Sequence, residues 1–311
     1  MRTSPVLLIL LCVGCTAPPA PPQDLSQLLL TLFRDAQPAD QDAEKALVAA
    51  LTELDEVHLP SFDLESPIGD RAVSPARLTA EWRDGFEVPS GLVGDDLEAC
   101  SGTSPSADCE AVQEQAQVPL AVLGLSPHPL SAHLNLIVDD NQACIDADSV
   151  KFARRSWTDG PCLLDGGCST TQSVTAIRTK SLIADIWYDQ HHEHHLTALA
   201  DDRQVLVSRG WTERVWWSDR CTQSWDQSFT LDLWIPDAED PSQTQRVYAI
   251  WSSVHLNGIS EDLFVRMLRQ GAGERFDNTD AMLDGDVCGW RDDEHDRADD
   301  VDAACVDGGG A

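Results

Sequence analysis

The feature that most constrains the fold is the alternation of apolar and polar residues in the second half of the chain. The segments 131–138, 180–188, 204–217, 228–236 and 246–256 each place apolar side chains at nearly every second position. Because successive side chains of a β-strand point to opposite faces of a sheet, this pattern predicts strands with one apolar face. The gaps between the segments are short, so we predict an antiparallel meander of about five to six strands.

Three tryptophans depart from this alternation. Trp187, Trp216 and Trp234 lie out of phase with the apolar residues of their own strands. Their rings are therefore expected on the other face of the sheet, where a pocket or a partner would lie.

Helical spacing replaces the alternation on both sides of the sheet region. Leucines recur at intervals of three and four residues over 24–34 and again over 40–55, which predicts two helices joined as a hairpin. Ser260 can cap a C-terminal helix, which is expected to break near Gly271–Gly273. The predicted fold is α+β: an N-terminal helical hairpin, then the antiparallel meander, covered on one face by the C-terminal helix.

The amino terminus carries an export signal. It reads MRTSPVLLILLCVGCTAPPAPPQ, with one arginine, a short apolar run and a small residue before Cys15. The run is too short to span a bilayer, which takes about 20 apolar residues. This arrangement resembles the lipobox of bacterial lipoproteins, although Cys12 stands where that family usually has leucine. The resemblance implies a lipid on Cys15, and Thr16 in place of aspartate implies the outer membrane.

The remaining cysteines favour disulfides. Of the ten cysteines, Cys12 lies in the signal and Cys15 would take the lipid, so 10 − 2 leaves 8. An even number in an oxidising compartment is typical of a disulfide framework, whose pairing the sequence alone does not fix. Sequence proximity favours Cys100–Cys109, Cys162–Cys168 and Cys288–Cys305, which leaves Cys144 and Cys221. The alternative is structural zinc, but the closest spacings are wider than those of usual zinc sites.

The charge of the chain argues against nucleic-acid binding. Acidic residues outnumber basic ones by 53 to 21, and the formal net charge is −32 at pH 7. Such a surface repels phosphate backbones and bare anionic membranes, which makes a lipid anchor more necessary. The acidic residues between Asp284 and Asp302 offer ligands to Ca²⁺, but runs of this kind are more often solvated tails.

These features divide the chain into five stretches. They are a signal peptide (1–14), the lipidated cysteine with a Pro-rich tether (15–23), a helical and irregular N-terminal region (24–117), the sheet with its C-terminal helix (118–283) and an acidic tail (284–311). Short helices are also expected near 75–83 and 109–116.

Four histidines flank one glutamate in the sequence HHEHH at 191–195. Imidazole and carboxylate groups are ligands for zinc, copper and nickel. On a strand, His191, Glu193 and His195 would share one face, although residues two apart lie about 6.5–7 Å from one another. The stretch lies between two strand patterns, so a solvated polar loop is the favoured interpretation. Adventitious metal binding and a dedicated metal site are the alternatives.

Two functions of different classes remain open. Residues 118–283 resemble START-like domains in shape, a resemblance that implies no function by itself. No nucleophile elbow, phosphate-binding loop or dinucleotide fingerprint occurs in the sequence. The first hypothesis is an exported, lipid-anchored, non-catalytic module that binds a small apolar ligand or an envelope protein. The alternative is a metal-dependent envelope hydrolase that uses HHEHH with another histidine such as His133 or His255.

Overall fold

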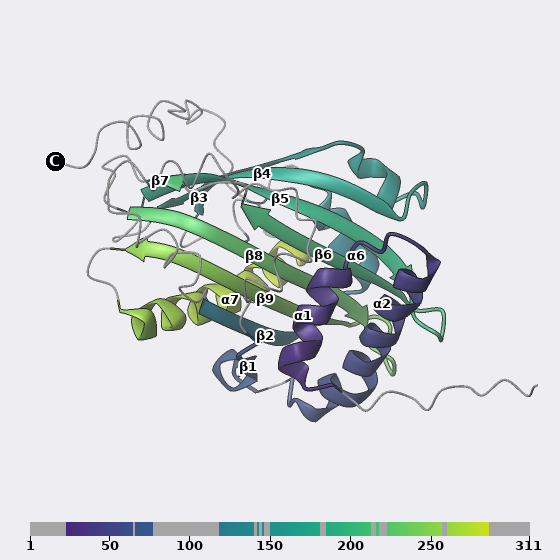
Figure 1. Cartoon of the computed structure of the whole chain (residues 1–311). Helices are drawn as coiled ribbons and strands as arrows, with labels where there is room; N and C mark the ends of the chain where they lie inside the picture. The colour runs from purple at the N-terminus through teal and green to yellow at the C-terminus, as the bar shows by residue number, and fades with distance from the viewer. Residues whose placement is uncertain are drawn as a thin grey trace, which may run out of the picture.

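One antiparallel sheet of nine strands forms the centre of the computed structural model (Figure 1). The structure describes residues 23–64, 66–76, 118–139, 142, 145, 150–180, 185–212, 216–217, 223–256 and 260–285. Within them the strands are β1 (Ala72–Val73), β2 (Val118–Ser126), β3 (Val150–Trp157), β4 (Thr170–Lys180), β5 (Asp185–Ala198), β6 (Gln204–Thr212), β7 (Trp216–Trp217), β8 (Gln223–Pro236) and β9 (Thr244–Leu256).

The sheet is a meander along most of its width. Its order is β1-β2-β9-β8-β6-β5-β4-β3, with β7 paired to β8, and every pair is antiparallel. The predicted meander is confirmed, since β3, β4, β5, β6, β8 and β9 follow one another in both chain and space. The edge of the meander is extended by β2, which pairs with the last strand, β9.

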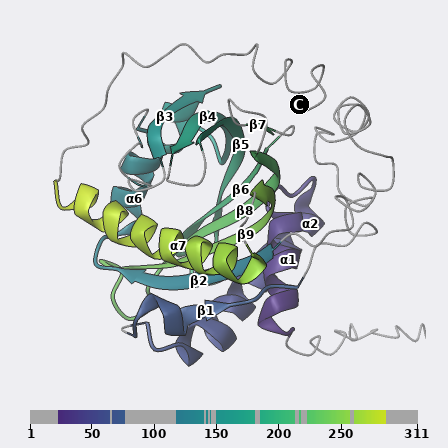
Figure 2. The ribbon, with the colours of Figure 1, turned by 90° about the vertical axis from the view of Figure 1, so that its left-hand side faces the viewer.

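Helices cover both faces of this sheet. The predicted hairpin of α1 (Leu25–Asp35) and α2 (Gln41–Glu53) lies across one face (Figure 1). The sheet curves around the other side, where α7 (Glu261–Leu283) runs across the concave face and α6 (Leu130–Ile137) lies near it (Figure 2). The α+β arrangement predicted from the sequence, an antiparallel sheet with the C-terminal helix across one face, is confirmed. Single turns lie at η1 (Leu54–His58), η2 (Leu59–Ser61), η3 (Ile68–Arg71) and η4 (Gly160–Leu163).

The larger hydrophobic core lies between the helical hairpin and the convex face of the sheet. Leu29 and Phe33 of α1 and Leu51 of α2 are almost completely buried there. The ring of Phe33 lies 5.7 Å from that of Phe229 and 5.4 Å from that of Trp251. Burial of each such side chain contributes about 1.5–3 kcal/mol, so the hairpin is an integral part of the packed sheet.

A smaller apolar cluster attaches α7 to the edge of the concave face. Ala272 and Phe276 of α7 pack on Leu120 and Val122 of β2 and on Ile250 of β9. These contacts lie at the β2–β9 side of the sheet. Beyond them, α7 passes over strands whose side chains on the concave face are polar.

The prediction of a strand over 131–138 is wrong, because these residues form α6. Leu130, His133 and Ile137 recur at helical spacing and are buried together. Alternate residues of this short run are apolar as well, so its sequence fits either period. Packing against Leu206 of β6 stabilises the helical alternative.

The expected break in the C-terminal helix is also wrong. The helix continues without interruption from Glu261 to Leu283, across Gly271 and Gly273. A glycine inside a helix costs about 1 kcal/mol relative to alanine. Burial of Ala272 and Phe276 against β2 offsets this cost. In the part of the chain that the structure describes, no helix is both long and apolar enough to cross a bilayer.

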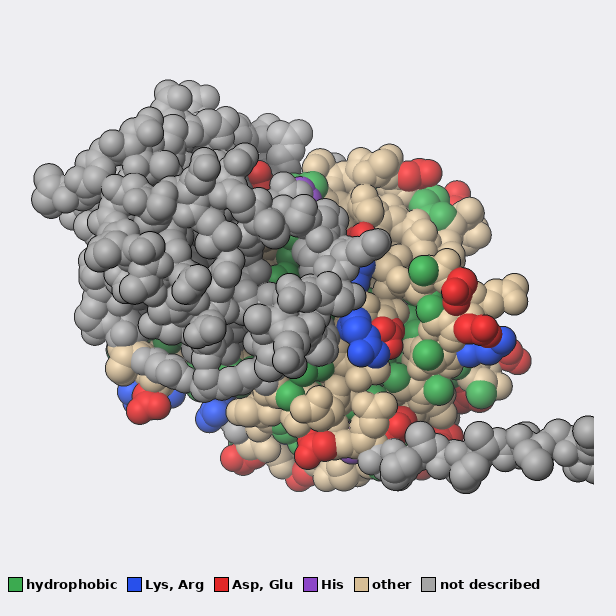
Figure 3. All heavy atoms as spheres, in the orientation of Figure 1, with side chains coloured by type: hydrophobic (Ala, Val, Ile, Leu, Met, Phe, Trp, Pro, Cys, Tyr) green, Lys and Arg blue, Asp and Glu red, His purple; other side chains and the backbone are tan. Residues whose placement is uncertain are grey.

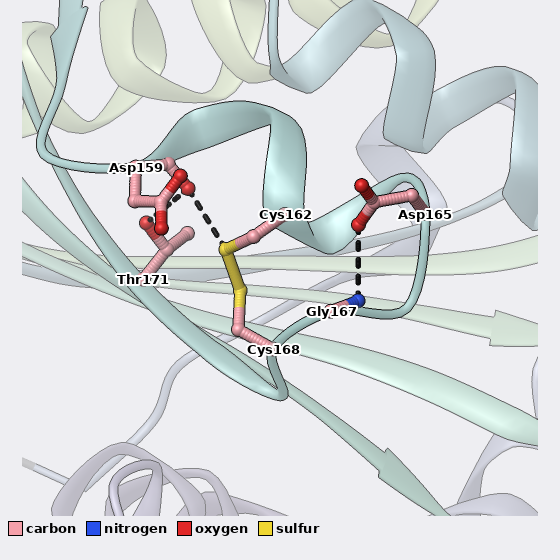
Figure 4. Close-up of a disulfide and its surroundings, with 6 residues drawn as sticks. All are labelled: Asp159, Cys162, Asp165, Gly167, Cys168 and Thr171. Atoms are coloured by element: carbon pink, nitrogen blue, oxygen red, sulfur yellow. Dashed lines mark hydrogen bonds between the residues drawn. A yellow bond between two sulfur atoms is a disulfide. The ribbon is translucent and has the colours of Figure 1, made fainter.

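One of the expected disulfides closes the loop between β3 and β4 (Figure 4). Cys162 and Cys168 are bonded, with their Cα atoms 5.3 Å apart. The Asp-Gly-Gly sequence between them forms the turn: Gly166 has a φ of 71°, and Gly167 donates its N–H to Asp165 Oδ1 at 3.0 Å. Cys100, Cys109, Cys144, Cys221, Cys288 and Cys305 lie outside the described residues, as does Cys15.

Candidate functional site

The concave face of the sheet is polar where it passes beneath α6 and α7. His194 of β5 lies opposite Ser208 of β6, and Ser208 lies opposite Asp232 of β8. All three side chains are buried. Because desolvating polar groups is costly unless they have partners, a row of them inside a fold indicates a site rather than simple packing.

A cavity of about 40 Å³ lies between this polar face, α6 and α7. It is lined by His133, Leu136, Ile137, Gln142, Ile145, His192, His194, Ser208, Asp232, Leu233, Trp234, Arg246, Val247, Arg275, Phe276 and Thr279. We call this cavity with its lining the inner chamber. In the present conformation it has room for a few water molecules.

Trp234 lines the inner chamber, as the phase of its strand predicted. Its ring packs with the apolar side of α6 and with Leu206, on the opposite face from Leu233 and Ile235. The side chains of Trp187 and Trp216 lie outside the described part of the structure.

His133 of α6 is the least satisfied polar group of the chamber. The residue is 1% exposed, and neither ring nitrogen has a hydrogen-bond partner among the described residues. Burial, together with smaller electrostatic contributions from Arg246 and His128, lowers the pKa of His133 to about 3. The imidazole is therefore neutral at pH 7, with one donor and one acceptor nitrogen.

Two more imidazoles line the chamber from β5. The rings of His192 and His194 are stacked, with centroids 5.7 Å apart, and Ser173 Oγ lies 3.1 Å from His194 Nε2. Gly210 of β6 makes room for them, since an added Cβ would lie only 2.8 Å from His192 Cδ2 and 2.5 Å from Thr230 Oγ1. The position requires glycine because both neighbouring strands direct side chains over it.

Ionic contacts fasten α7 above the chamber. Arg246 of β9 is 4% exposed and donates from Nη2 to Asp280 Oδ2 at 2.8 Å and from Nη1 to the Phe276 carbonyl at 3.2 Å. Ser126 donates to the other oxygen of Asp280 at 2.6 Å. Arg275 of α7 lies 3.7 Å from Asp232 on the sheet. The C-terminal half of α7 is thus tied to the sheet by charge as well as by apolar packing.

The HHEHH stretch lies within β5, so its interpretation as a solvated loop is wrong. The strand alternation sends His192 and His194 into the chamber and the other three residues toward the helical hairpin. In a loop between two strands, these side chains would face water. Here the neighbouring strands β4 and β6 hold both sets in a packed environment.

The three candidate metal ligands on the convex side contact different partners. Glu193 accepts from Arg209 Nε at 2.6 Å and from Gln172 Nε2 at 3.1 Å. His195 Nε2 lies 3.0 Å from Glu44 Oε2 of α2, while His191 stacks on Trp211 at 5.8 Å. Within the described ranges no three His, Cys, Asp or Glu side chains gather closely enough to hold a metal. His195 joins the hairpin to the sheet, whereas Glu193 and His191 contact side chains of the neighbouring strands.

Sequence reasoning missed the acidic and basic members of the chamber. Asp232 of β8, Arg246 of β9 and Arg275 of α7 line the chamber but were not among the residues singled out from the sequence. The available signal was positional: Asp232 is two residues from Trp234 and therefore shares its face. His133, considered as an additional metal ligand, lines the chamber from α6. The side chain of His255 lies outside the described part.

No family model matches the sequence, and no curated protein sequence matches it. Among solved structures, a STAR-related lipid transfer protein from Xanthomonas axonopodis has 9% identity and a TM-score of 0.37, over 53% of this chain and 85% of that chain. An aromatase/cyclase from Streptomyces has 8% identity and a TM-score of 0.33, over 56% and 98%. A Thermus thermophilus protein has 11% identity and a TM-score of 0.38, over 52% and 94%. Overlap of this extent carries no argument about function.

Proposed function

We propose that this protein is a non-catalytic module that holds a small molecule in the inner chamber, between α7 and the concave face of the sheet. The observation that carries this proposal is His133, which is 1% exposed, lines the chamber and lacks a partner for either ring nitrogen among the described residues. An unsatisfied buried polar group costs about 1–3 kcal/mol. A ligand that hydrogen-bonds this imidazole would recover that free energy.

The lining defines the chemical class of this ligand. Ile137, Ile145 and Phe276 offer apolar surface on the helical side, whereas His194 and Ser208 offer hydrogen bonds from the sheet. A neutral imidazole binds a hydroxyl or carbonyl group without requiring a charge. The ligand is therefore a mainly apolar molecule that carries an uncharged polar group, which specifies the small apolar ligand expected from the sequence.

Uptake of such a ligand requires a helix to move. The cavity volume of about 40 Å³ is well below the several hundred cubic ångströms that enclose a drug-sized molecule. The helix α7 is attached to the sheet through Asp280, and α6 covers the opposite side of the chamber. Displacement of one of these helices would enlarge the chamber and expose the polar side chains of the sheet that line it.

Mass spectrometry of the full chain tests the proposal. The native spectrum is expected to contain a noncovalent excess of small-molecule mass that is absent from the denatured spectrum. Leu136→Trp should abolish this excess, because Leu136 lines the chamber and an indole would fill it. Asn135→Trp is the matched control, since its position on the same helix is exposed.

The outcome that contradicts the proposal is an excess mass that both tryptophan variants retain. Such a result would place the bound molecule elsewhere. Equal native and denatured masses for the unsubstituted chain would favour the other form of the first hypothesis, a module that binds an envelope protein.

We also propose that the protein is exported and anchored to the outer membrane through a lipid on Cys15. The N-terminal sequence supports this, and the Cys162–Cys168 disulfide suits an oxidising compartment. Cys15→Ser is expected to move the protein from the membrane fraction to the soluble fraction of a cell lysate. An unmodified N-terminal cysteine in the mass spectrum of the mature chain would contradict the anchor.

A further inference from the structure

The outer side of α7 borders an open groove of about 560 Å³ that is separate from the inner chamber. Arg266, Arg269, Gly273 and Asp277 line it at helical spacing, and Arg71 of η3 lines the facing side. None of these five residues lines the inner chamber. We call this feature the arginine groove.

Among the described residues, the three arginines of this groove lack the ion pairs that other arginines make. Arg34 pairs with Asp35 at 2.7 Å, and Arg209 pairs with Glu193 at 2.6 Å. Figure 3 shows several basic side chains beside acidic ones on the hairpin side of the molecule. Among the described residues, no carboxylate lies within ion-pair distance of Arg71, Arg266 or Arg269.

Two of these guanidinium groups are also partly desolvated. The Nε atoms of Arg71 and Arg269 are buried without a hydrogen-bond partner in the described residues. Arg71 reaches in from η3 until its Nη1 lies 3.6 Å from the position that a Cβ on Gly124 would occupy. Burial lowers the pKa of Arg71, and attraction to Asp277 and Asp63 offsets only part of this effect. An unpaired, desolvated cation is costly, so an added anion would stabilise it.

The acidic residues of the groove compensate only part of this positive charge. Glu274 is held by its own helix, where it accepts a 2.6 Å hydrogen bond from Gln270. Within the described ranges, Arg266 donates only to the carbonyl of Asp262 in the same helix, at 3.4 Å. Three arginines against Glu274 and Asp277 give a local formal charge of 3 − 2 = +1, in a chain whose net charge is −32.

We propose that the arginine groove binds a phosphate group. Guanidinium forks match the oxygens of phosphate in paired hydrogen bonds, and three of them can share a dianion. The phosphate belongs either to a free small molecule or to a membrane lipid headgroup, which present the same chemistry to the groove. The site is independent of the inner chamber, because it uses the outer face of α7.

Titration calorimetry with inorganic pyrophosphate tests the free-ligand source. The full chain carrying Cys15→Ser is used, so that no lipid at that position contributes. Arg266→Gln combined with Arg269→Gln is expected to weaken binding by about tenfold or more, equivalent to about 1.4 kcal/mol. Arg34→Gln is the control, since it removes one positive charge from an exposed pair on α1.

Sedimentation with phosphatidylcholine vesicles, with and without phosphatidylglycerol, tests the headgroup source. Binding that requires phosphatidylglycerol and is lost in the double variant supports a lipid headgroup. Pyrophosphate binding that is lost in the same variant supports a free phosphate ligand. If the unsubstituted groove binds neither probe, or if the double variant binds as tightly as the Arg34→Gln control, the proposal is overturned.

Discussion

At the scale of single residues, the imidazole of His133 links the inner chamber to pH. Burial lowers the pKa of His133 to about 3, with Arg246 and His128 contributing, whereas a histidine in an unfolded chain titrates near 6.5. The unfolded chain therefore binds a proton that the folded protein does not accept. The stability associated with neutral His133 is complete above about pH 6.5 and is lost progressively as the pH falls toward 3.

This linkage predicts a pH effect that a single substitution removes. Between about pH 7 and about pH 5, the unsubstituted protein should lose about 2 kcal/mol more of its unfolding free energy than His133→Leu, at about 1.4 kcal/mol per pH unit. Urea denaturation at the two pH values measures this difference. Equal losses in both proteins would show that His133 is protonated in the fold.

Two glycines should respond in opposite directions to the same substitution. Gly210→Ala is expected to destabilise the protein by about 1–3 kcal/mol, because the new methyl group would meet Thr230 and His192. Gly271→Ala is expected to stabilise α7 by about 0.5–1 kcal/mol, because nothing lies within 4 Å of the added carbon. Thermal unfolding of the two variants tests this. A stable Gly210→Ala variant would contradict the close contacts across β6.

At the scale of elements, Asp280 fastens α7 to the sheet. It accepts hydrogen bonds from Arg246 and Ser126, two residues that α7 must release if the chamber opens on that side. Asp280→Asn should cost about 1–3 kcal/mol, because it leaves the charge of Arg246 buried without its partner. Hydrogen exchange within α7 should accelerate in this variant.

Asp277→Asn supplies the control for this experiment. It removes the same charge from the same helix, but Asp277 is exposed and makes no ion pair within the described part of the chain. Equal acceleration of exchange in both variants would mean that the lost charge, rather than the contact with Arg246, loosens the helix.

The elements also show what sequence can and cannot predict. Strands with one apolar face, such as β8, were predicted because their alternation is regular. The strand β4 was missed because Thr170–Lys180 is mostly polar on both faces, and its pairing with β3 and β5 decides its structure. For the same reason HHEHH resembled a loop. The inner chamber was foreseen only through the phase of Trp234, since the approach of His133 from α6 depends on tertiary packing.

At the scale of the whole molecule, the sheet has two faces with different roles. Its convex face buries the hairpin in the larger apolar core, while its concave face keeps polar groups beneath α7. The contact of His195 with Glu44 also joins the hairpin to the sheet, and the ion pair of Arg203 with Asp55 joins the sheet to η1, which follows α2. The hairpin can therefore support the convex face of the sheet while the inner chamber on the concave face changes its volume.

This shared core predicts cooperative unfolding of hairpin and sheet. Leu51→Ala removes a completely buried side chain of α2 and should cost about 2–5 kcal/mol. Circular dichroism and tryptophan fluorescence should report one coincident urea transition, shifted to lower concentration in the variant. Separate transitions by the two methods would indicate that the hairpin unfolds independently.

A crystal structure of the protein, purified from the cells that make it, tests the central claim most directly. We predict electron density for a non-protein molecule between α7 and strands β5, β6 and β8, with a polar atom within hydrogen-bond distance of a His133 ring nitrogen. The apolar part of that molecule should contact Ile137 and Phe276, and α6 or α7 should lie further from the sheet than it does here. A chamber that stays near 40 Å³ and contains only water would contradict the ligand-binding account.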